Sequence, residues 1–246
     1  KNWKLILTSG IFLIITNIST VHAANYTWTN ANGTGTIHDA GNWSPNGVPG
    51  IADDATFDST SSTAATLDNG WSVGTLTLSA DYSNTLSFQN FDVNIGGNLV
   101  INGGTMAFGS GTHRIEGHLQ HNNGAINLNS CELEITCNKL TLSASNWTSG
   151  TSSVSVNCST GDFRFTASSI IDFYNLSINL TNDSDTKRDF RILGVDGVDS
   201  VLVRNQFTLI KGQIDEDWII CPNQFSATDP EGGNGGIYFT GSPTPR

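Results

Sequence analysis

Charged residues and strong helix formers are scarce in this chain. Only 13% of its 246 residues are charged, methionine occurs once, and long runs of Glu, Lys and Ala are missing. This composition disfavours a helical domain of any size. Gly, Ser, Thr and Asn are abundant instead, and the apolar residues are mostly Leu, Ile, Val and Phe. We therefore expect one all-β domain or a stack of β-repeats.

Basic residues are also few, with 11 against 22 acidic residues. Removing Lys1 and Lys4 with the signal peptide described below leaves 9 against 22, a net charge of −13. Such a chain repels nucleic acid and anionic lipid over a Debye length, so we predict no nucleic-acid partner. The acidity itself indicates solubility and identifies no ligand.

Long apolar runs are missing apart from one stretch near the N-terminus. Residues 5–15 are mostly apolar, but these 11 residues are fewer than the roughly 18 to 20 that cross a bilayer core. Lys1 and Lys4 precede them, and the small-residue pattern Val21-His22-Ala23 follows. We predict a secretory signal peptide over residues 1–23, cleaved after Ala23, with no transmembrane segment afterwards. The expected location is extracellular, either secreted or at the cell surface.

Cysteines number only four, and all lie in the part predicted to be exported: Cys131, Cys137, Cys158 and Cys221. Disulfides persist in exported proteins, and four cysteines allow three pairings. None of the cysteines has the paired C-x-x-C spacing of a zinc site.

A period of 20 residues indicates the fold. Residues 85–104, 105–124 and 125–144 align without a gap. Their apolar positions coincide as Leu86/Met106/Ile126, Phe88/Phe108/Leu128 and Ile95/Ile115/Ile135, with Leu99 opposite Leu119 in the first two repeats. Apolar and polar residues alternate, which buries one face of each strand, and coils of this kind must stack to cover that face. We predict a right-handed parallel β-helix, or β-solenoid, with coils of about 20 residues.

The period continues with slippage on both sides. Upstream, residues 73–78 resemble residues 95–101 with a shorter corner. At one corner, the alignment brings together Asn98, His118 and Asn138, which predicts a ladder of side-chain hydrogen bonds along the stack.

Downstream, the repeat predicts a disulfide. Leu133, Ile135 and Cys137 recur 21 residues later as Val154, Val156 and Cys158. Cys137 and Cys158 are therefore expected on adjacent coils, where stacked Cα atoms lie within disulfide range. The pairing of Cys131 and Cys221 stays open.

These patterns divide the chain into four segments. They are a signal peptide (1–23), an N-terminal capping segment with a Trp/Asp motif (24–60), a β-solenoid (61–221) and a Gly/Pro-rich tail or linker (222–246). No closing cap is evident in the sequence, so we expect the chain to be the N-terminal part of a larger protein.

The capping segment carries a recognisable series of residues. Trp28 is followed by Gly-Asn-Trp-Ser at 41–44, Gly-Val-Pro-Gly at 47–50 and the acidic run at 52–58. This series resembles the leading motif of large bacterial surface proteins with autotransporter-like or haemagglutinin-like β-helix repeats. Residues 97–105 and 173–178 are similar to repeats of the same proteins. The resemblance implies a bacterial surface or secreted β-helix, a group that includes adhesins and matrix components.

Trp28, Trp43, Asp53 and Asp54 have two interpretations. Two tryptophans suit sugar stacking and adjacent carboxylates suit a hard cation, which makes these residues a candidate binding site. The favoured interpretation is a cap, in which Trp28, Trp43 and Phe57 cover the open end of the rod while Asp53 and Asp54 bond turn amides. A solenoid needs this cover because an exposed end coil pairs with other chains.

Three histidines and a glutamate fall within nine residues: His113, Glu116, His118 and His121. Such a set can bind zinc. The 20-residue register instead places His113 opposite Leu133, His118 at the asparagine corner, and His121 opposite Thr141. Because these are different strand and corner positions, we predict no metal site.

Carbohydrate-cleaving β-helices gather carboxylates and a basic residue on one face, and glycoside hydrolysis needs a carboxylate pair at a defined separation. The candidates here are Asp162, Arg164, Asp172 and the acidic run 215–217. None recurs across coils, so we predict no catalytic residue and no cofactor.

The resulting hypothesis is a non-enzymatic structural or adhesive β-solenoid of a bacterial surface or secreted protein. Its partner would be an extracellular glycan, a matrix or another surface protein. The alternative is a carbohydrate-binding or carbohydrate-cleaving β-helix, which the fold and the two tryptophans favour.

Overall fold

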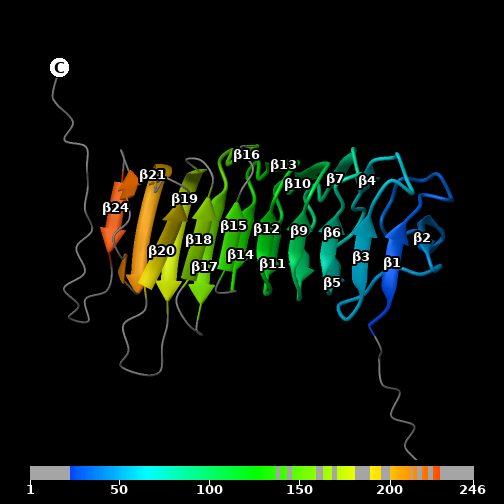
Figure 1. Ribbon diagram of the computed structural model, residues 1–246, viewed down its shortest axis with the longest axis horizontal. Helices are drawn as coiled ribbons and strands as arrows, with labels where there is room; N and C mark the ends of the chain where they lie inside the picture. The colour runs from blue at the N-terminus through cyan, green and yellow to red at the C-terminus, as the bar shows by residue number, and fades with distance from the viewer. Residues whose placement is uncertain are drawn as a thin grey trace, which may run out of the picture.

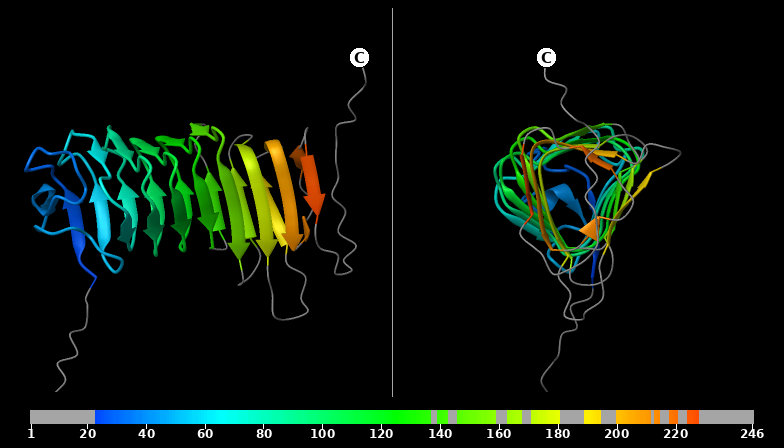
Figure 2. Two further views of the ribbon diagram at one scale, coloured as in Figure 1. Left: turned by 180° about the vertical axis from the view of Figure 1, so that it is seen from behind. Right: turned by 90° about the vertical axis from the view of Figure 1, so that its left-hand side faces the viewer.

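The computed structural model describes residues 23–136, 139–142, 146–158, 163–167, 171–180, 189–194, 200–211, 213–214, 218–220 and 224–227. These residues form a rod of stacked coils (Figure 1) whose outline is roughly triangular when seen along its axis (Figure 2). The predicted parallel β-solenoid is confirmed. Among the described residues, no helix is long and apolar enough to cross a bilayer.

Three sheets run along the rod, and each regular coil contributes one strand to each of them. Sheet A contains, in spatial order, β2 (Trp43–Ser44), β1 (Asn25–Trp28), β3 (Asp54–Phe57), β6 (Leu76–Leu78), β9 (Leu99–Ile101), β12 (Leu119–His121), β15 (Lys139–Leu142), β18 (Phe163–Ala167), β20 (Asp189–Gly194) and β22 (Gln213–Ile214). Sheet B contains β4 (Ala65–Thr66), β7 (Thr85–Ser87), β10 (Thr105–Ala107), β13 (Ala125–Asn127) and β16 (Trp147–Thr148).

Sheet C contains β5 (Trp71–Val73), β8 (Val93–Ile95), β11 (Thr112–Ile115), β14 (Glu132–Ile135), β17 (Ser153–Cys158), β19 (Ile171–Leu180), β21 (Ser200–Lys211) and β23 (Trp218–Ile220). β24 (Gln224–Ala227) also pairs with β21, so the stack continues beyond Cys221 into the segment that we assigned to the tail. A short 3₁₀ turn, η1 (Ala40–Asn42), precedes β2. The β1–β2 pair is antiparallel.

The 20-residue register is confirmed in sheets B and C. Met106 pairs with both Leu86 and Ile126, and Ile115 pairs with both Ile95 and Ile135. Apolar side chains stack inward along these ladders and are almost fully buried. The upstream coil also pairs as predicted, with Val73 opposite Ile95.

The register of the third coil differs from the gapless alignment in sheet A. Leu119 pairs with Leu140, and His121 pairs with Leu142, a shift of 21 residues; the prediction that His121 lies opposite Thr141 is wrong. A shift of 20 would stack Lys139 on the buried Leu119. The extra corner residue leaves Lys139 exposed and Leu140 buried, which avoids the cost of burying an ammonium group.

Side-chain hydrogen bonds link successive corners. Asn98 Oδ1 accepts the backbone N–H of His118 at 2.8 Å, which confirms the first step of the predicted ladder. Asn138 lies outside the described residues. At another corner, Asn122 Nδ2 donates to Asn102 Oδ1 at 2.8 Å.

Close stacking of the coils restricts some corners to glycine. Gly109 has φ +78°, and a Cβ built on it would lie 1.4 Å from the carbonyl oxygen of Gln89 on the preceding coil. Both the backbone conformation and the space therefore require glycine at this position.

Candidate functional site

The predicted tryptophan motif lies inside the N-terminal end of the rod. Trp28 is fully buried and Trp43 is 3% exposed. Their ring centroids lie 5.2 Å apart in an edge-to-face arrangement, and Phe57 packs 5.7 Å from Trp28 and 5.5 Å from Trp43. The expectation that these tryptophans offer exposed faces for sugar stacking is wrong, because their faces are covered by other aromatic rings. The cluster fills the end of the core, as the capping interpretation requires.

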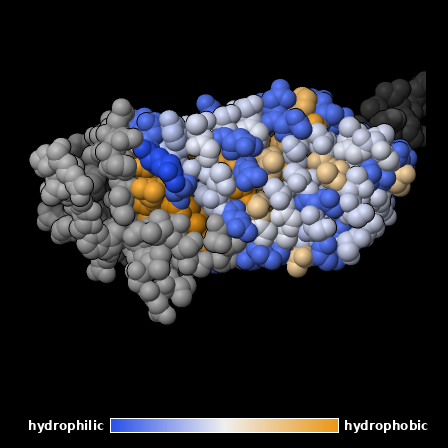
Figure 3. All heavy atoms as spheres, turned by 90° about the horizontal axis from the view of Figure 1, so that it is seen from above, coloured by the Kyte–Doolittle hydropathy of each residue, from blue (hydrophilic) through white to orange (hydrophobic). Residues whose placement is uncertain are grey.

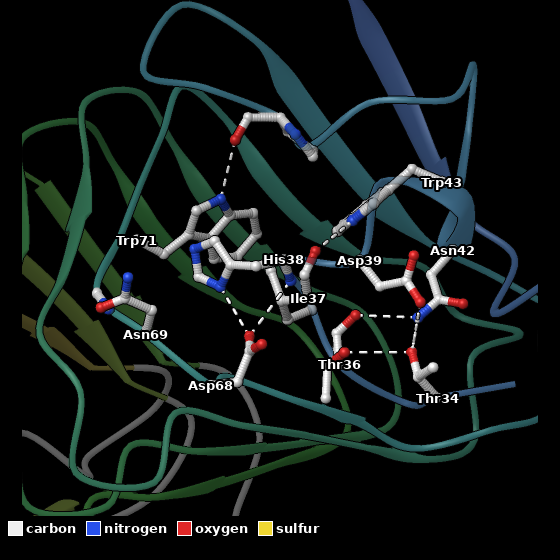
Figure 4. Close-up of polar contacts among 12 residues, drawn as sticks. Thr34, Thr36, Ile37, His38, Asp39, Asn42, Trp43, Asp68, Asn69 and Trp71 are labelled. Carbon is white, nitrogen blue, oxygen red and sulfur yellow. Dashed lines mark hydrogen bonds and ion pairs between the residues drawn. The ribbon is translucent and has the colours of Figure 1, made fainter. Parts of the chain in front are cut away.

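Hydrogen bonds hold this cluster in place (Figure 4). Trp43 Nε1–H donates to the carbonyl oxygen of Ile37 at 2.8 Å, and Trp71 Nε1–H donates to that of Pro49 at 2.9 Å. Asn42 is fully buried, and its Nδ2 donates to Thr34 Oγ1 at 2.7 Å. The loop over the end of the rod is thus tied to the aromatic core beneath it.

Asp53 and Asp54 bond backbone amides, as predicted. Asp53 Oδ1 accepts the N–H of Ala24 at 2.9 Å, and Asp53 Oδ2 accepts the N–H of Gly50 at 2.8 Å. Asp54 Oδ1 accepts the N–H of Thr75 at 3.1 Å. These carboxylates join the chain entry, the cap loop and the first coils. Within the described part of the chain, no group of three or more potential metal ligands gathers here or elsewhere.

The three histidines lie on different surfaces of the coil. His113 points into the core from sheet C, and its Nε2–H donates to the carbonyl oxygen of Phe108 at 2.8 Å. Burial lowers the pKa of His113 to about 4. His121 is buried on sheet A, where its Nε2 lies 3.2 Å from the carbonyl oxygen of Gly124. His118 instead contacts Gln120 Nε2 and Thr141 Oγ1 at the surface, at 2.8 and 3.1 Å.

Asp172 is the one proposed catalytic acid whose side chain is described. Its Oδ1 accepts from Ser149 Oγ at 2.6 Å, and its Oδ2 accepts from Arg204 Nε at 3.0 Å. The Asp172 carboxylate therefore connects the end of sheet B to β19 and β21. Asp162 and the run 215–217 lie outside the described residues. Arg164 is placed by its backbone in β18, opposite Lys139.

The predicted disulfide remains a prediction. The 21-residue register behind it is confirmed, because Leu133 pairs with Val154 and Ile135 pairs with Val156. Cys158 is buried at the end of β17, but Cys137 lies outside the described residues, as does Cys221. Cys131 is buried as a thiol, and burial raises its pKa to about 12.

A shallow groove of about 390 Å³ runs over the outer face of sheet C. Two rows of outward side chains line it, each formed by residues in register on successive strands. Row 1 consists of Thr112, Glu132, Ser153, Asn175 and Gln206. Row 2 consists of Glu134, Ser155, Ser177 and Thr208. Buried apolar side chains of the same strands lie between the rows and form the floor.

Side-chain hydrogen bonds order parts of both rows. Asn175 Nδ2 donates to Ser153 Oγ at 3.0 Å, and Asn205 Nδ2 donates to Asn175 Oδ1 at 2.7 Å. Beside row 2, Asn157 Nδ2 donates to Glu134 Oε1 at 2.9 Å. These contacts connect adjacent coils, so the polar side chains are held in an array along the rod.

The 20-residue period did not reveal this groove. Its signal lies in the polar positions that alternate with the buried ones, once the strands are placed in register. Glu132 to Ser153 is a step of 21 residues, Ser153 to Asn175 is 22, and Asn175 to Gln206 is 31. A search for one fixed period therefore misses the rows beyond the regular coils.

Comparison with known protein families, curated proteins and solved structures found no match to this chain.

Proposed function

We propose that this chain is a non-enzymatic structural or adhesive β-solenoid segment of a bacterial surface or secreted protein. The observation that carries the proposal is the pair of polar rows on sheet C, which repeat similar chemistry coil after coil. A repeated array suits contact with an extended partner, whereas catalysis requires a few groups converging on one bond. Seen from above, the N-terminal part of the rod is also largely hydrophilic, with scattered apolar residues (Figure 3).

The contacts of the carboxylates support this proposal. Asp53 and Asp54 accept backbone amides, and Asp172 bonds Ser149 and Arg204. Removing such a carboxylate leaves buried or half-buried donors without partners, which costs about 1 to 3 kcal/mol. These acids thus have structural roles that join neighbouring coils.

The alternative function, a carbohydrate-cleaving β-helix, is favoured by one specific observation. Glu132 and Glu134 both project into the groove from β14. Residues two apart on a strand are separated by about 7 Å along it. Inverting glycosidases hold their two carboxylates about 6.5 to 9.5 Å apart.

Incubation with polysaccharides and a reducing-sugar assay separates the two functions. We expect the purified chain to release no new reducing ends from neutral or acidic polysaccharides, and to retain binding to an immobilised partner. Turnover that Glu132→Gln abolishes would establish the enzyme and refute the proposal.

Export is tested separately by placing the chain behind an initiating methionine in a bacterial host. N-terminal sequencing of the protein recovered outside the cytoplasm is expected to begin at Ala24. Retention of the uncleaved chain in the cytoplasm would contradict the extracellular part of the proposal.

A further inference from the structure

The two rows of sheet C define a regular lattice of hydrogen-bonding groups. Successive coils are separated by about 4.8 Å along the rod, and the rows lie about 7 Å apart along the strands. Ser155 and Ser177 are adjacent members of row 2, and Ser153 and Asn175 are the corresponding members of row 1. All four are partly or fully exposed. A partner lying along the rod therefore meets similar groups at equal intervals.

The chemistry of these groups selects an uncharged, hydroxyl-rich partner. Serine and threonine hydroxyls both donate and accept, and Asn and Gln amides do the same with separate atoms. The carboxylates of Glu132 and Glu134 accept hydrogen bonds from hydroxyls but repel anions. The whole chain is also acidic, with a net charge of −11. Polyanions are therefore disfavoured by both the groove and its surroundings.

The backbone of the groove argues against an added peptide strand. β17 pairs with β14 on one side and with β19 on the other. Its backbone N–H and C=O groups are thus already used, whereas peptides that extend a sheet need a free strand edge. A partner over this face has to bind through its own side groups to the side chains of the rows.

We propose that the groove over sheet C binds a neutral polysaccharide lying along the rod, with its hydroxyls bonded to rows 1 and 2. This inference rests on the proposed function and names the partner class of the same surface. A polymer fits better than a single sugar because the binding groups recur from coil to coil, so successive sugars can make equivalent contacts.

Affinity electrophoresis in gels containing soluble polysaccharides tests the inference. The probes are hydroxyethyl cellulose, galactomannan and dextran as neutral polymers, with polygalacturonate as the anionic one. We expect retardation by at least one neutral polymer and none by polygalacturonate. The double variant Ser155→Ala/Ser177→Ala is expected to bind about 10-fold more weakly, because two hydrogen bonds worth roughly 1 kcal/mol each are lost.

The matched control is Thr105→Ala/Ser87→Ala, two outward residues of sheet B. It is expected to be retarded as the wild type is. No retardation by any neutral polymer, retardation by polygalacturonate alone, or equal weakening in both double variants would overturn the inference. Reducing-end release in the same samples would refute the non-enzymatic function without affecting the groove, so the two failures are distinguishable.

A second, independent observation concerns the start of the predicted mature chain. The backbone nitrogen of Ala24 lies 2.9 Å from Asp53 Oδ1, and the carbonyl oxygen of Ala24 accepts the N–H of Asp54 at 2.9 Å. Ala24 directly precedes β1, at the N-terminal end of the rod. Hydrolysis of the Ala23–Ala24 bond by a signal peptidase would consume one water and release residues 1–23 as a carboxylate. The amine left on Ala24 then takes up a proton.

We propose that Asp53 is the docking carboxylate for the α-ammonium group of Ala24, so that cleavage converts an amide hydrogen bond into an ion pair. Asp53 Oδ2 stays bonded to Gly50 and Asp54 stays bonded to Thr75, which holds the receiving site in place before and after cleavage. Charge-assisted hydrogen bonds are roughly twice as strong as neutral ones. Processing would thereby tighten the attachment of β1 to the rod.

The test compares chains that begin at Ala24 with a free or an acetylated amine. At pH 6 the free amine is expected to lower the unfolding equilibrium constant roughly two- to fivefold, as a partly exposed ion pair does. This difference is expected to vanish at pH 10, where the α-amine has lost its proton. It should also be absent in Asp53→Asn. Equal stability of the two chains at pH 6, or a difference that persists at pH 10, would overturn the proposal even if Asp53→Asn does not fold.

Discussion

His113 shows how one residue couples this core to pH. The side chain lies between Val93 and Leu133 in an apolar ladder, and Phe88 and Phe108 pack against its ring. Burial lowers its pKa from 6.5 to about 4, while the hydrogen bond to Phe108 and the charge of Asp92 act in the opposite direction. The neutral imidazole is therefore the form that the core accepts.

This pKa predicts a loss of stability in mild acid. Below pH 6.5 the unfolded chain binds a proton at His113 that the folded chain takes up only near pH 4. The free energy of unfolding should fall across that window, by up to about 3 kcal/mol from this residue. Urea titrations at pH 7 and pH 4.5 are expected to show a smaller loss for His113→Leu. The same loss in both proteins would contradict the role of His113.

At the scale of the element, the corners limit how closely coils stack. Gly109 and Gly33 both adopt positive φ, at +78° and +72°. Only Gly109 also faces the preceding coil, whereas nothing lies within 4 Å of a Cβ built on Gly33. The pair therefore separates backbone conformation from stacking.

Alanine at these two glycines should have unequal effects. Gly33→Ala is expected to cost about 1 to 2 kcal/mol, the penalty of a left-handed non-glycine residue. Gly109→Ala pays that penalty and must also push the coil away from Gln89 O, so a clearly larger loss in the urea midpoint is expected. Similar losses for the two variants would show that coil spacing does not limit Gly109.

At the scale of the whole molecule, the rod is stabilised by contacts between neighbouring coils. Each strand pairs with the strand of the coil before and after it, as β10 does with β7 and β13. In such a one-dimensional stack, stability is approximately a sum of coil and interface terms. A local defect should then act mainly on nearby coils.

Native-state hydrogen exchange measures this locality. Phe108→Leu leaves a space beside Phe88 and His113, which the aromatic ring fills in the wild type. We expect reduced amide protection in β7 to β14 and nearly unchanged protection in β1 and β3. A uniform decrease along the whole rod would indicate that the stack unfolds as one unit.

The sequence by itself determined the class of fold, because the alternation of apolar and polar residues and the 20-residue spacing of Leu86, Met106 and Ile126 are local features. It also predicted that Asp53 and Asp54 bond turn amides. Both predictions rest on physical constraints that act within or between adjacent coils.

Only the tertiary structure decided where the irregular corners change the register and which outward residues share a row. Corner length costs little entropy, so the chain adds a residue before Lys139 and longer connections further on wherever core packing demands it. The groove on sheet C and the placement of Trp28 and Trp43 inside the rod both depend on that packing. A residue's distance from the next apolar position in sequence predicts its face of the strand, but the stacking of the core selects its neighbours along the rod.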